Sequence, residues 1–184
     1  MIILASASPR RKELLKLIFD DFEIIPADIE ETVRRNIDLE QYPEYLALKK
    51  SRYIAEKRPG DDVVIGCDTG VFIDDMMLGK PDDEAQAAEM LRLLSGRVHK
   101  VITGCSVFYK GQNVSFSDTT EVEFYHLSES DIKEYIATGE PMDKAGAYGI
   151  QGKGALLVKR INGDYYNVVG MPVGALKQKL KMLL

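Results

Sequence analysis

The chain has 184 residues, of which 45% are hydrophobic and 29% are charged, and these proportions exclude collagen-like, low-complexity and wholly disordered proteins. The 29 Asp and Glu residues outnumber the 24 Lys and Arg residues, and the net charge is −5. This balance argues against a nucleic-acid polymer as the main partner, because proteins that bind duplexes carry a basic excess. A local cluster of lysines and arginines can still bind a small anion.

Cysteine usage and hydropathy indicate a cytoplasmic protein without a membrane anchor. Cys67 and Cys105 form no CxxC pair and are too few for a disulfide scaffold, which favours a reducing compartment. No apolar stretch approaches the roughly 20 residues that a bilayer-spanning helix needs. Residues 1–5 lack a preceding basic segment, so they predict a strand rather than a secretion signal.

The N-terminal part of the sequence predicts alternating strands and helices. Ser8 followed by Pro9 is typical of a helix start, since serine caps free N–H groups and proline fits the first turn. The apolar run at 63–67 predicts a buried strand that ends at Asp68 and Thr69. In chain order we expect a strand at 2–5, a helix at 9–18, a strand at 22–26, a loop at 28–36, a helix at 43–57 closed by Pro59 and Gly60, the strand at 63–67, and a hairpin of strands 71–73 and 76–78 around Asp74 and Asp75.

The C-terminal part predicts two long strands, further helices and a second hairpin. Asn162 followed by Gly163 is a strong hairpin signal. In chain order we expect a helix at 82–94, strands at 98–109 and 114–125 around a turn at 110–112, a helix at 128–139, a glycine-rich segment at 146–154, paired strands at 155–161 and 165–169, and a helix at 172–183. Interleaved strands and helices with added hairpins favour one α/β domain, with a mixed sheet flanked by helices.

Two polar segments that follow buried strands are candidates for binding a ligand. Residues 6–11 lead into a helix N-terminus, where free N–H groups attract anions and where Arg10 and Arg11 add forked donors. The alternative is a capped helix with two solvated arginines. Asp68 and Thr69 follow the next buried strand, a position where α/β proteins place ligand-binding and catalytic groups. The alternative there is an Asx turn that begins the hairpin.

Two later segments are also candidates, although each has an ordinary structural explanation. Lys80 lies in a turn locked by Pro81, but the Walker pattern fails there, so a P-loop NTPase is not expected. Residues 140–152 are rich in glycine and carry Gln151, whose amide could bind a base or a sugar. A solvated lysine and a long surface loop are the alternatives. His99 and His126 lack metal-binding spacing, and no Gly-x-Ser-x-Gly nucleophile elbow occurs.

Taken together, these segments resemble the Maf family of nucleotide pyrophosphatases over nearly the whole chain. Each motif alone is a weak signal, whereas all six in the same order are highly specific. The segments that carry the resemblance are residues 6–15, 66–69, 78–81, 94–97 with His99, 140–152 and 163–166.

The resemblance implies an ITPase-like fold, with an elongated mixed sheet and two lobes around a central cleft, in a single domain covering residues 1–184. It implies hydrolysis of a nucleoside triphosphate to the monophosphate and pyrophosphate, with Mg²⁺ or Mn²⁺ as cofactor. It also implies house-cleaning of nucleotide pools and a link to septum formation and cell-division arrest. No membrane or nucleic-acid partner is expected, and a homodimer is left open.

Particular residues take their expected roles from this resemblance. Asp68 corresponds to the family's general base, and Glu31 to an acidic position that could share the metal with Asp68. Phosphate binding is expected from Ser8, Arg11, Lys50 and Lys80.

Three positions separate the subfamilies: in the family, enzymes that act on dTTP and UTP carry Arg, Thr and Gln there, whereas those that act on 7-methyl-GTP carry Trp, Gln and Glu. Here these positions are Arg10, Thr69 and Gln151, so the resemblance implies the dTTP and UTP subfamily. Two departures, Cys67 before the aspartate and Gly70 after Thr69, concern the shape of the cleft. An ITPase-like enzyme for deaminated purines and a nucleotide-binding regulator of division with incidental hydrolysis are the alternatives.

Overall fold

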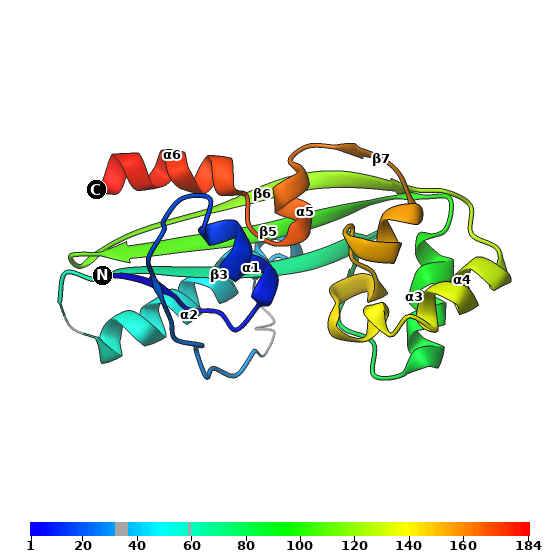
Figure 1. The fold of residues 1–184 in the computed structure, drawn as a ribbon, viewed down its shortest axis with the longest axis horizontal. Coiled ribbons are helices and arrows are strands. Elements are labelled where there is room, and N and C mark those ends of the chain that lie inside the picture. The colour runs from blue at the N-terminus through cyan, green and yellow to red at the C-terminus, as the bar shows by residue number, and fades with distance from the viewer. Residues whose placement is uncertain (32–36, 59) are drawn as a thin grey trace. The chain divides into compact units, whose positions relative to one another are not determined.

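The protein is described from a computed structural model that covers residues 1–31, 37–58 and 60–184. Its strands form one mixed sheet in the order β2-β1-β3-β5-β6-β7, with β4 paired to β3 (Figure 1). Strand β1 is parallel to β2 and β3, whereas the β3–β4 and β6–β7 pairs are antiparallel. The strands are β1 Ile2–Leu4, β2 Glu23–Ile24, β3 Val63–Ile73, β4 Met76–Leu78, β5 Val98–Tyr109, β6 Gln112–Phe124 and β7 Val158–Asn162.

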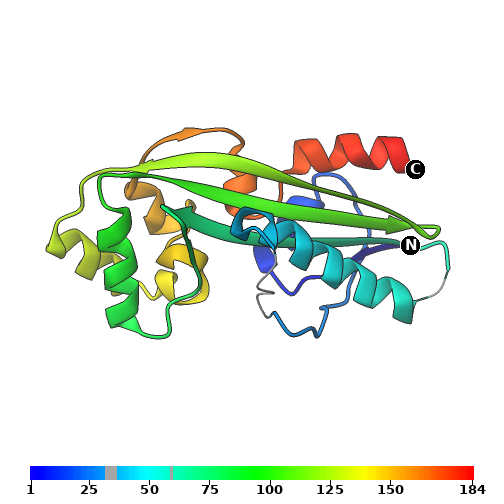
Figure 2. The same cartoon turned by 180° about the vertical axis from the view of Figure 1, so that it is seen from behind.

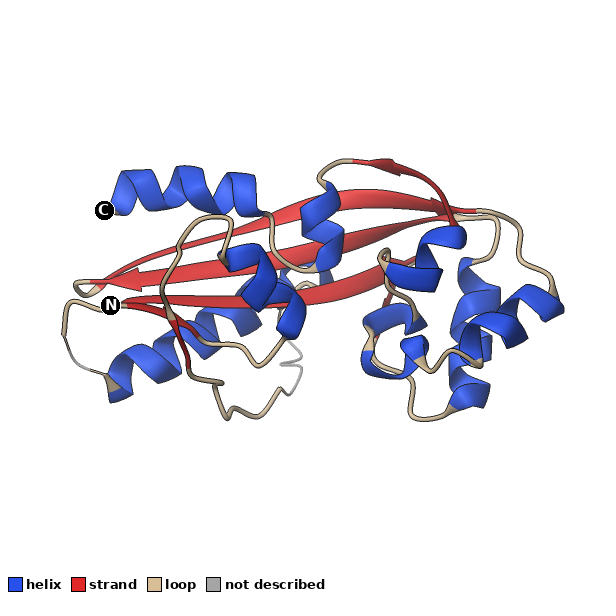
Figure 3. Ribbon diagram, viewed as in Figure 1, coloured by secondary structure: helices blue, strands red, loops and turns tan. Residues whose placement is uncertain are grey.

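Helices flank the sheet, which confirms the predicted α/β class (Figure 3). No helix within the described residues is long and apolar enough to cross a membrane. The α-helices are α1 Pro9–Leu15, α2 Tyr42–Lys57, α3 Glu84–Leu94, α4 Glu129–Ile136, α5 Tyr165–Val169 and α6 Val173–Leu183. Short 3₁₀ turns are η1 Leu39–Gln41, η2 Glu140–Asp143, η3 Ala145–Ala147 and η4 Gly152–Leu156.

The chain divides into two compact units. The first comprises Met1–Thr69, Thr103–Asp118 and Gly170–Leu184, and the second comprises Gly70–Ile102 and Thr119–Val169. The chain therefore passes from one unit to the other within β3, β5 and β6. The cleft expected between two lobes stays a prediction.

In the first unit, helix α2 lies directly on the sheet, on the face turned toward the viewer in Figure 2. Two glycines allow this close approach. A Cβ atom on Gly66 of β3 would lie 2.4 Å from the backbone oxygen of Ala47, and one on Gly104 of β5 would lie 2.2 Å from the backbone nitrogen of Glu44. Because both clashes involve backbone atoms, only glycine permits this distance between helix and sheet.

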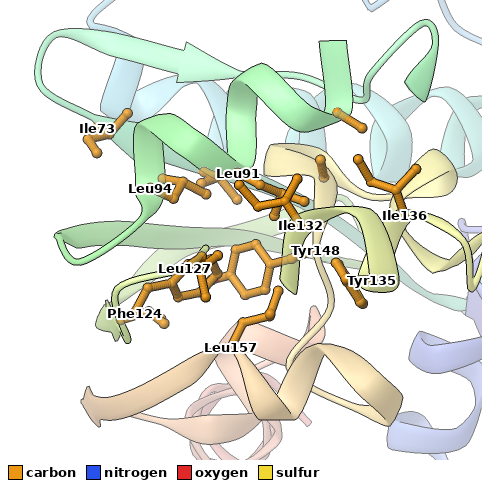
Figure 4. Close-up of a cluster of buried hydrophobic side chains, with 14 of the residues drawn as sticks. Ile73, Leu91, Leu94, Phe124, Leu127, Ile132, Tyr135, Ile136, Tyr148 and Leu157 are labelled. Carbon is orange, nitrogen blue, oxygen red and sulfur yellow. The ribbon is translucent and has the colours of Figure 1, made fainter. Parts of the chain in front are cut away.

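The second unit has its own hydrophobic core, built from helices α3 and α4, strand residues and the glycine-rich segment. Leu91 and Leu94 of α3 lie next to Ile132 of α4 (Figure 4). Helix α4 begins at a capping box, in which Ser128 and Asp131 each bind the other's backbone N–H. This local signal explains why the helix begins at Ser128, as the sequence predicts.

The prediction that a strand ends at Asp68 and Thr69 is wrong. Strand β3 continues without interruption to Ile73, so both polar residues lie within it. Their side chains have partners in the same unit, because Lys50 binds Asp68 and Arg11 binds Thr69. A satisfied polar side chain does not have to end a strand, and the apolar pattern resumes at Val71.

The predicted strand at 165–169 is also wrong, since these residues form helix α5. The Asp164 carboxylate accepts the backbone N–H of Tyr166, which is an Asx-type start for a helix. Asn167, fully buried, donates to the carbonyl of Val101 and to the hydroxyl of Thr120. In the part of the chain that the structure describes, β7 pairs only with β6, and residues 155–156 belong to η4. The predicted loop at 28–36 and the helix stop at Pro59 fall partly outside the described residues.

We expect His99 to make the protein less stable in acid. His99 is buried, its Nε2 atom lies 2.7 Å from the hydroxyl of Tyr148, and burial lowers the pKa of His99 from 6.5 to about 4. Between these pH values the unfolded chain binds a proton that the folded chain excludes, so the free energy of unfolding falls as the pH falls, by up to about 3 kcal/mol.

Urea unfolding at pH 7 and pH 4.5 measures this loss. His99→Gln should show a smaller difference between the two pH values than the parent protein. His126→Gln, at an exposed histidine, is the matched control and should behave like the parent. Equal pH dependence in the parent and His99→Gln would contradict the prediction.

Candidate active site

Two carboxylates converge on one lysine in the first unit. The Nζ atom of Lys50 lies 2.6 Å from Asp68 Oδ1 and 2.6 Å from Glu31 Oε1. The side chains of Lys50 and Asp68 are only 11% and 16% exposed, whereas that of Glu31 is 53% exposed. The structure thus brings together the expected base Asp68, the residue Glu31 that was expected to share a metal with it, and the expected phosphate-binding residue Lys50.

Asp68 lies in an environment that makes its carboxylate more basic. Burial raises the pKa of Asp68, while the positive charges of Lys50 and Arg11 oppose this shift. Lys50 reaches Asp68 because Gly66 lets α2 rest on β3. A carboxylate with a raised pKa, held by a hydrogen bond, has the properties of a general base.

Arg11 is held by three contacts near the start of α1. Its Nε donates to the carbonyl of Gly170 at 2.9 Å, Nη1 to the hydroxyl of Ser6 at 3.3 Å, and Nη2 to the hydroxyl of Thr69 at 3.0 Å. Ser8 caps α1 by accepting the backbone N–H of Arg11. A guanidinium fixed in this way is pre-organised, so little conformational entropy remains to be lost when it binds an anion.

Thr69, which the sequence analysis assigned to recognition of the base, is also one of the three residues that hold Arg11. Its hydroxyl lies 2.9 Å from that of Thr103, a fully buried residue of β5, and also accepts from Arg11. Sequence reasoning missed Thr103 and Ser6 as partners. Ser6 lay inside a motif that was already singled out, but Thr103 sits in an apolar strand with no local signal.

Lys80 and Gln151 lie in the second unit, and both are exposed. The turn that carries Lys80 is anchored to the glycine-rich segment, because the backbone N–H of Gly146 donates to the carbonyl of Gly79 at 3.0 Å. Gln151 immediately precedes η4, whose first turn is capped by a carboxylate that the sequence analysis did not single out. The Glu140 side chain accepts the backbone N–H groups of Lys153 and Gly154 at 3.0 and 3.2 Å.

The carboxylates of Asp68 and Glu31 could hold a divalent cation. Within residues 1–31, 37–58 and 60–184, no group of three or more His, Cys, Asp or Glu side chains could form a metal site. Mg²⁺, however, is commonly held by one or two carboxylates together with substrate phosphates. The carboxylate oxygens of Asp68 and Glu31 already converge on the ammonium group of Lys50, so they fit this donor set.

Similar solved structures define the class of fold. The Staphylococcus aureus Ham1 protein aligns with a TM-score of 0.57 and 18% identity over 100% of this chain and 99% of that one. A nucleoside-triphosphatase / dITP/XTP pyrophosphatase from Mycobacterium abscessus aligns with a TM-score of 0.52 and 18% identity, covering 100% and 97%. At this identity the likeness concerns the fold alone, and it confirms the ITPase-like expectation.

The sequence comparisons identify the family. Residues 1–183 match the family model for Maf-like protein, and the chain belongs to this family, as the resemblance predicted. A protein of Bacillus velezensis is 55% identical over 98% of this chain and 95% of its own length, and one of Bacillus cereus is 50% identical over 98% and 94%. Both of these relatives are named dTTP/UTP pyrophosphatase.

Proposed function

We propose that this protein is a nucleoside triphosphate pyrophosphatase that hydrolyses dTTP and UTP to the monophosphate and pyrophosphate. The observation that carries the proposal is the convergence of Asp68 and Glu31 on Lys50, with Arg11 held nearby in the same unit. A base and several fixed cations are what attack of water on a polyanionic phosphate requires. Relatives that are 50–55% identical over nearly the whole chain bear the name of this activity.

In the reaction, Asp68 takes a proton from the attacking water, the water oxygen bonds to phosphorus, and the α–β anhydride bond breaks to release pyrophosphate. Lys50 and Arg11 neutralise charge on the phosphate chain, with Lys80 and the capped start of α1 at Ser8 as further contacts. Asp68 and Glu31 would hold Mg²⁺ or Mn²⁺, which supplies further neutralisation of phosphate charge when it is bound.

The cellular role follows from this chemistry. Removal of noncanonical or excess pyrimidine nucleotides is house-cleaning of nucleotide pools, and a link to septum formation would act through those pools. We infer a cytoplasmic location, and the free thiols of Cys67 and Cys105 support a reducing compartment.

A nucleotide panel assayed for pyrophosphate release with Mg²⁺ and Mn²⁺ tests the proposal. We expect dTTP and UTP to give the highest kcat/KM. Preference for ITP and XTP would favour the ITPase-like alternative, and release of no pyrophosphate from any nucleotide would exclude the activity. A cellular division effect that persists in Asp68→Asn, with hydrolysis abolished, would favour the regulator alternative.

Gln151→Glu should erode the preference for pyrimidines. The glutamine amide offers a donor and an acceptor, whereas glutamate at neutral pH offers only acceptors and would face the carbonyl groups of the pyrimidine. A site left with unpaired polar groups rejects its substrate strongly, so kcat/KM for UTP and dTTP should fall by about 10- to 100-fold relative to 7-methyl-GTP.

The measurement is kcat/KM for UTP, dTTP and 7-methyl-GTP on the parent and on Gln151→Glu. Gln178→Glu makes the same chemical change at an exposed site on α6 and should keep the parental selectivity. A parental preference for 7-methyl-GTP would contradict the assignment of Arg10, Thr69 and Gln151.

A further inference from the structure

Tyr42 carries a buried hydroxyl that needs a partner. It is the first residue of α2, its side chain is almost fully enclosed at 2% exposed, and its hydroxyl has no hydrogen-bond partner among the described residues. Buried polar groups are nearly always hydrogen-bonded, because an unmade bond leaves the cost of desolvation uncompensated. A buried phenol of this kind therefore calls for a specific explanation.

The place of Tyr42 in the fold connects it with the catalytic carboxylates. Gly104 lets the first turn of α2 approach β5, since a Cβ atom there would lie 2.3 Å from the carbonyl carbon of Pro43. The same helix delivers Lys50 to Asp68 and Glu31. The Tyr42 ring is held by stacking on Tyr45, with 6.1 Å between ring centroids.

Electrostatics supports this placement. Burial raises the pKa of Tyr42, and the negative charges of Asp68 and Glu31 raise it further. These carboxylates are thus near enough to act on the phenol, and the phenol stays protonated at neutral pH. In that state it can donate a hydrogen bond but cannot serve as a base.

We propose that Tyr42 is a further catalytic residue, whose hydroxyl donates a hydrogen bond to a phosphoryl oxygen of the nucleotide bound beside Asp68 and Glu31. This inference rests on the proposed pyrophosphatase function. A phosphoryl oxygen is the acceptor that fits, because it is anionic and gains charge in the transition state. The attacking water is the poorer acceptor, since a hydrogen bond donated to its oxygen would withdraw electron density and make it less nucleophilic toward phosphorus.

Tyr42→Phe tests the proposal, because it keeps the ring and its packing and removes only the hydroxyl. We expect kcat/KM for UTP and dTTP to fall by about 10- to 100-fold, as for a lost hydrogen bond to a charged acceptor. Affinity for the non-hydrolysable α,β-imido-UTP should fall at least about fivefold. The melting temperature should stay the same or rise, because no protein hydrogen bond is lost.

Tyr53→Phe is the matched control. Tyr53 lies on the same helix, and its hydroxyl already accepts a hydrogen bond from Lys57. Its removal should leave both kcat/KM and the affinity for α,β-imido-UTP unchanged, in contrast to Tyr42→Phe.

Unchanged kcat/KM and unchanged α,β-imido-UTP affinity in Tyr42→Phe would overturn the proposal, as would a loss that only accompanies a lowered melting temperature. If the parent protein releases no pyrophosphate from any nucleotide, the proposed function is wrong. The affinity for α,β-imido-UTP then decides about Tyr42 by itself, because weaker binding supports the contact and equal binding refutes it.

Discussion

Asp68→Asn is expected to lower kcat for UTP and dTTP at least about 100-fold, because a general base contributes a factor of this order to a hydrolysis. Asparagine has nearly the same shape and can still accept the hydrogen bond that Lys50 donates at 2.6 Å. It cannot take a proton from water. The expected loss is therefore in turnover, with the fold preserved.

Pyrophosphate release under saturating UTP measures the effect, and circular dichroism with urea unfolding checks the fold. Asp75→Asn, in the exposed turn between β3 and β4, is the matched control and should keep full turnover. Near-normal turnover in a folded Asp68→Asn protein would exclude Asp68 as the base.

Lys50→Met is expected to have the second large effect. Methionine keeps the apolar stem of lysine but removes the ammonium group that lies 2.6 Å from both Asp68 and Glu31. Two carboxylates are then left without their shared cation, and the phosphate chain loses a charge-assisted contact. Removing one fixed donor that stabilises charge in the transition state costs about 3 kcal/mol, which corresponds to a loss of about 100-fold in kcat/KM.

All nucleotides should be affected alike, because Lys50 binds charge rather than the base. The neighbouring Lys49 provides the control, since its Nζ donates to the backbone carbonyl of Glu30 at an exposed position. Lys49→Met should keep kcat/KM within about twofold, as for most exposed substitutions. If Lys50→Met altered only the preference among bases, Lys50 would contact the base of the nucleotide and not its phosphates.

Much of the fold follows from signals that act between near neighbours. Ser8 with Pro9 predicts the start of α1, and Ser128 predicts that of α4, because capping bonds join residues three positions apart. The turn at Asp74 and Asp75 predicts the β3–β4 hairpin for the same reason. The two elements predicted wrongly, the end of β3 and the strand at 165–169, depend on distant partners. These partners are Lys50 and Arg11 for the polar residues of β3, and Thr120 and Val101 for Asn167.

By itself the sequence determined the types of residue available for the chemistry, the family to which the chain belongs and the order of most elements. The tertiary structure alone decided that Lys50 joins Asp68 to Glu31, that Thr103 supports Thr69, and that the hydroxyl of Tyr42 is enclosed near the same carboxylates. The physical reason is that partners distant in sequence must first be brought together: Thr69 meets Thr103 because β3 and β5 are neighbouring strands, and the contacts of Lys50 and the burial of Tyr42 require α2 to rest on these strands. That approach depends on the missing side chains of Gly66 and Gly104, and no local pattern in the sequence shows that α2 packs against these two glycines.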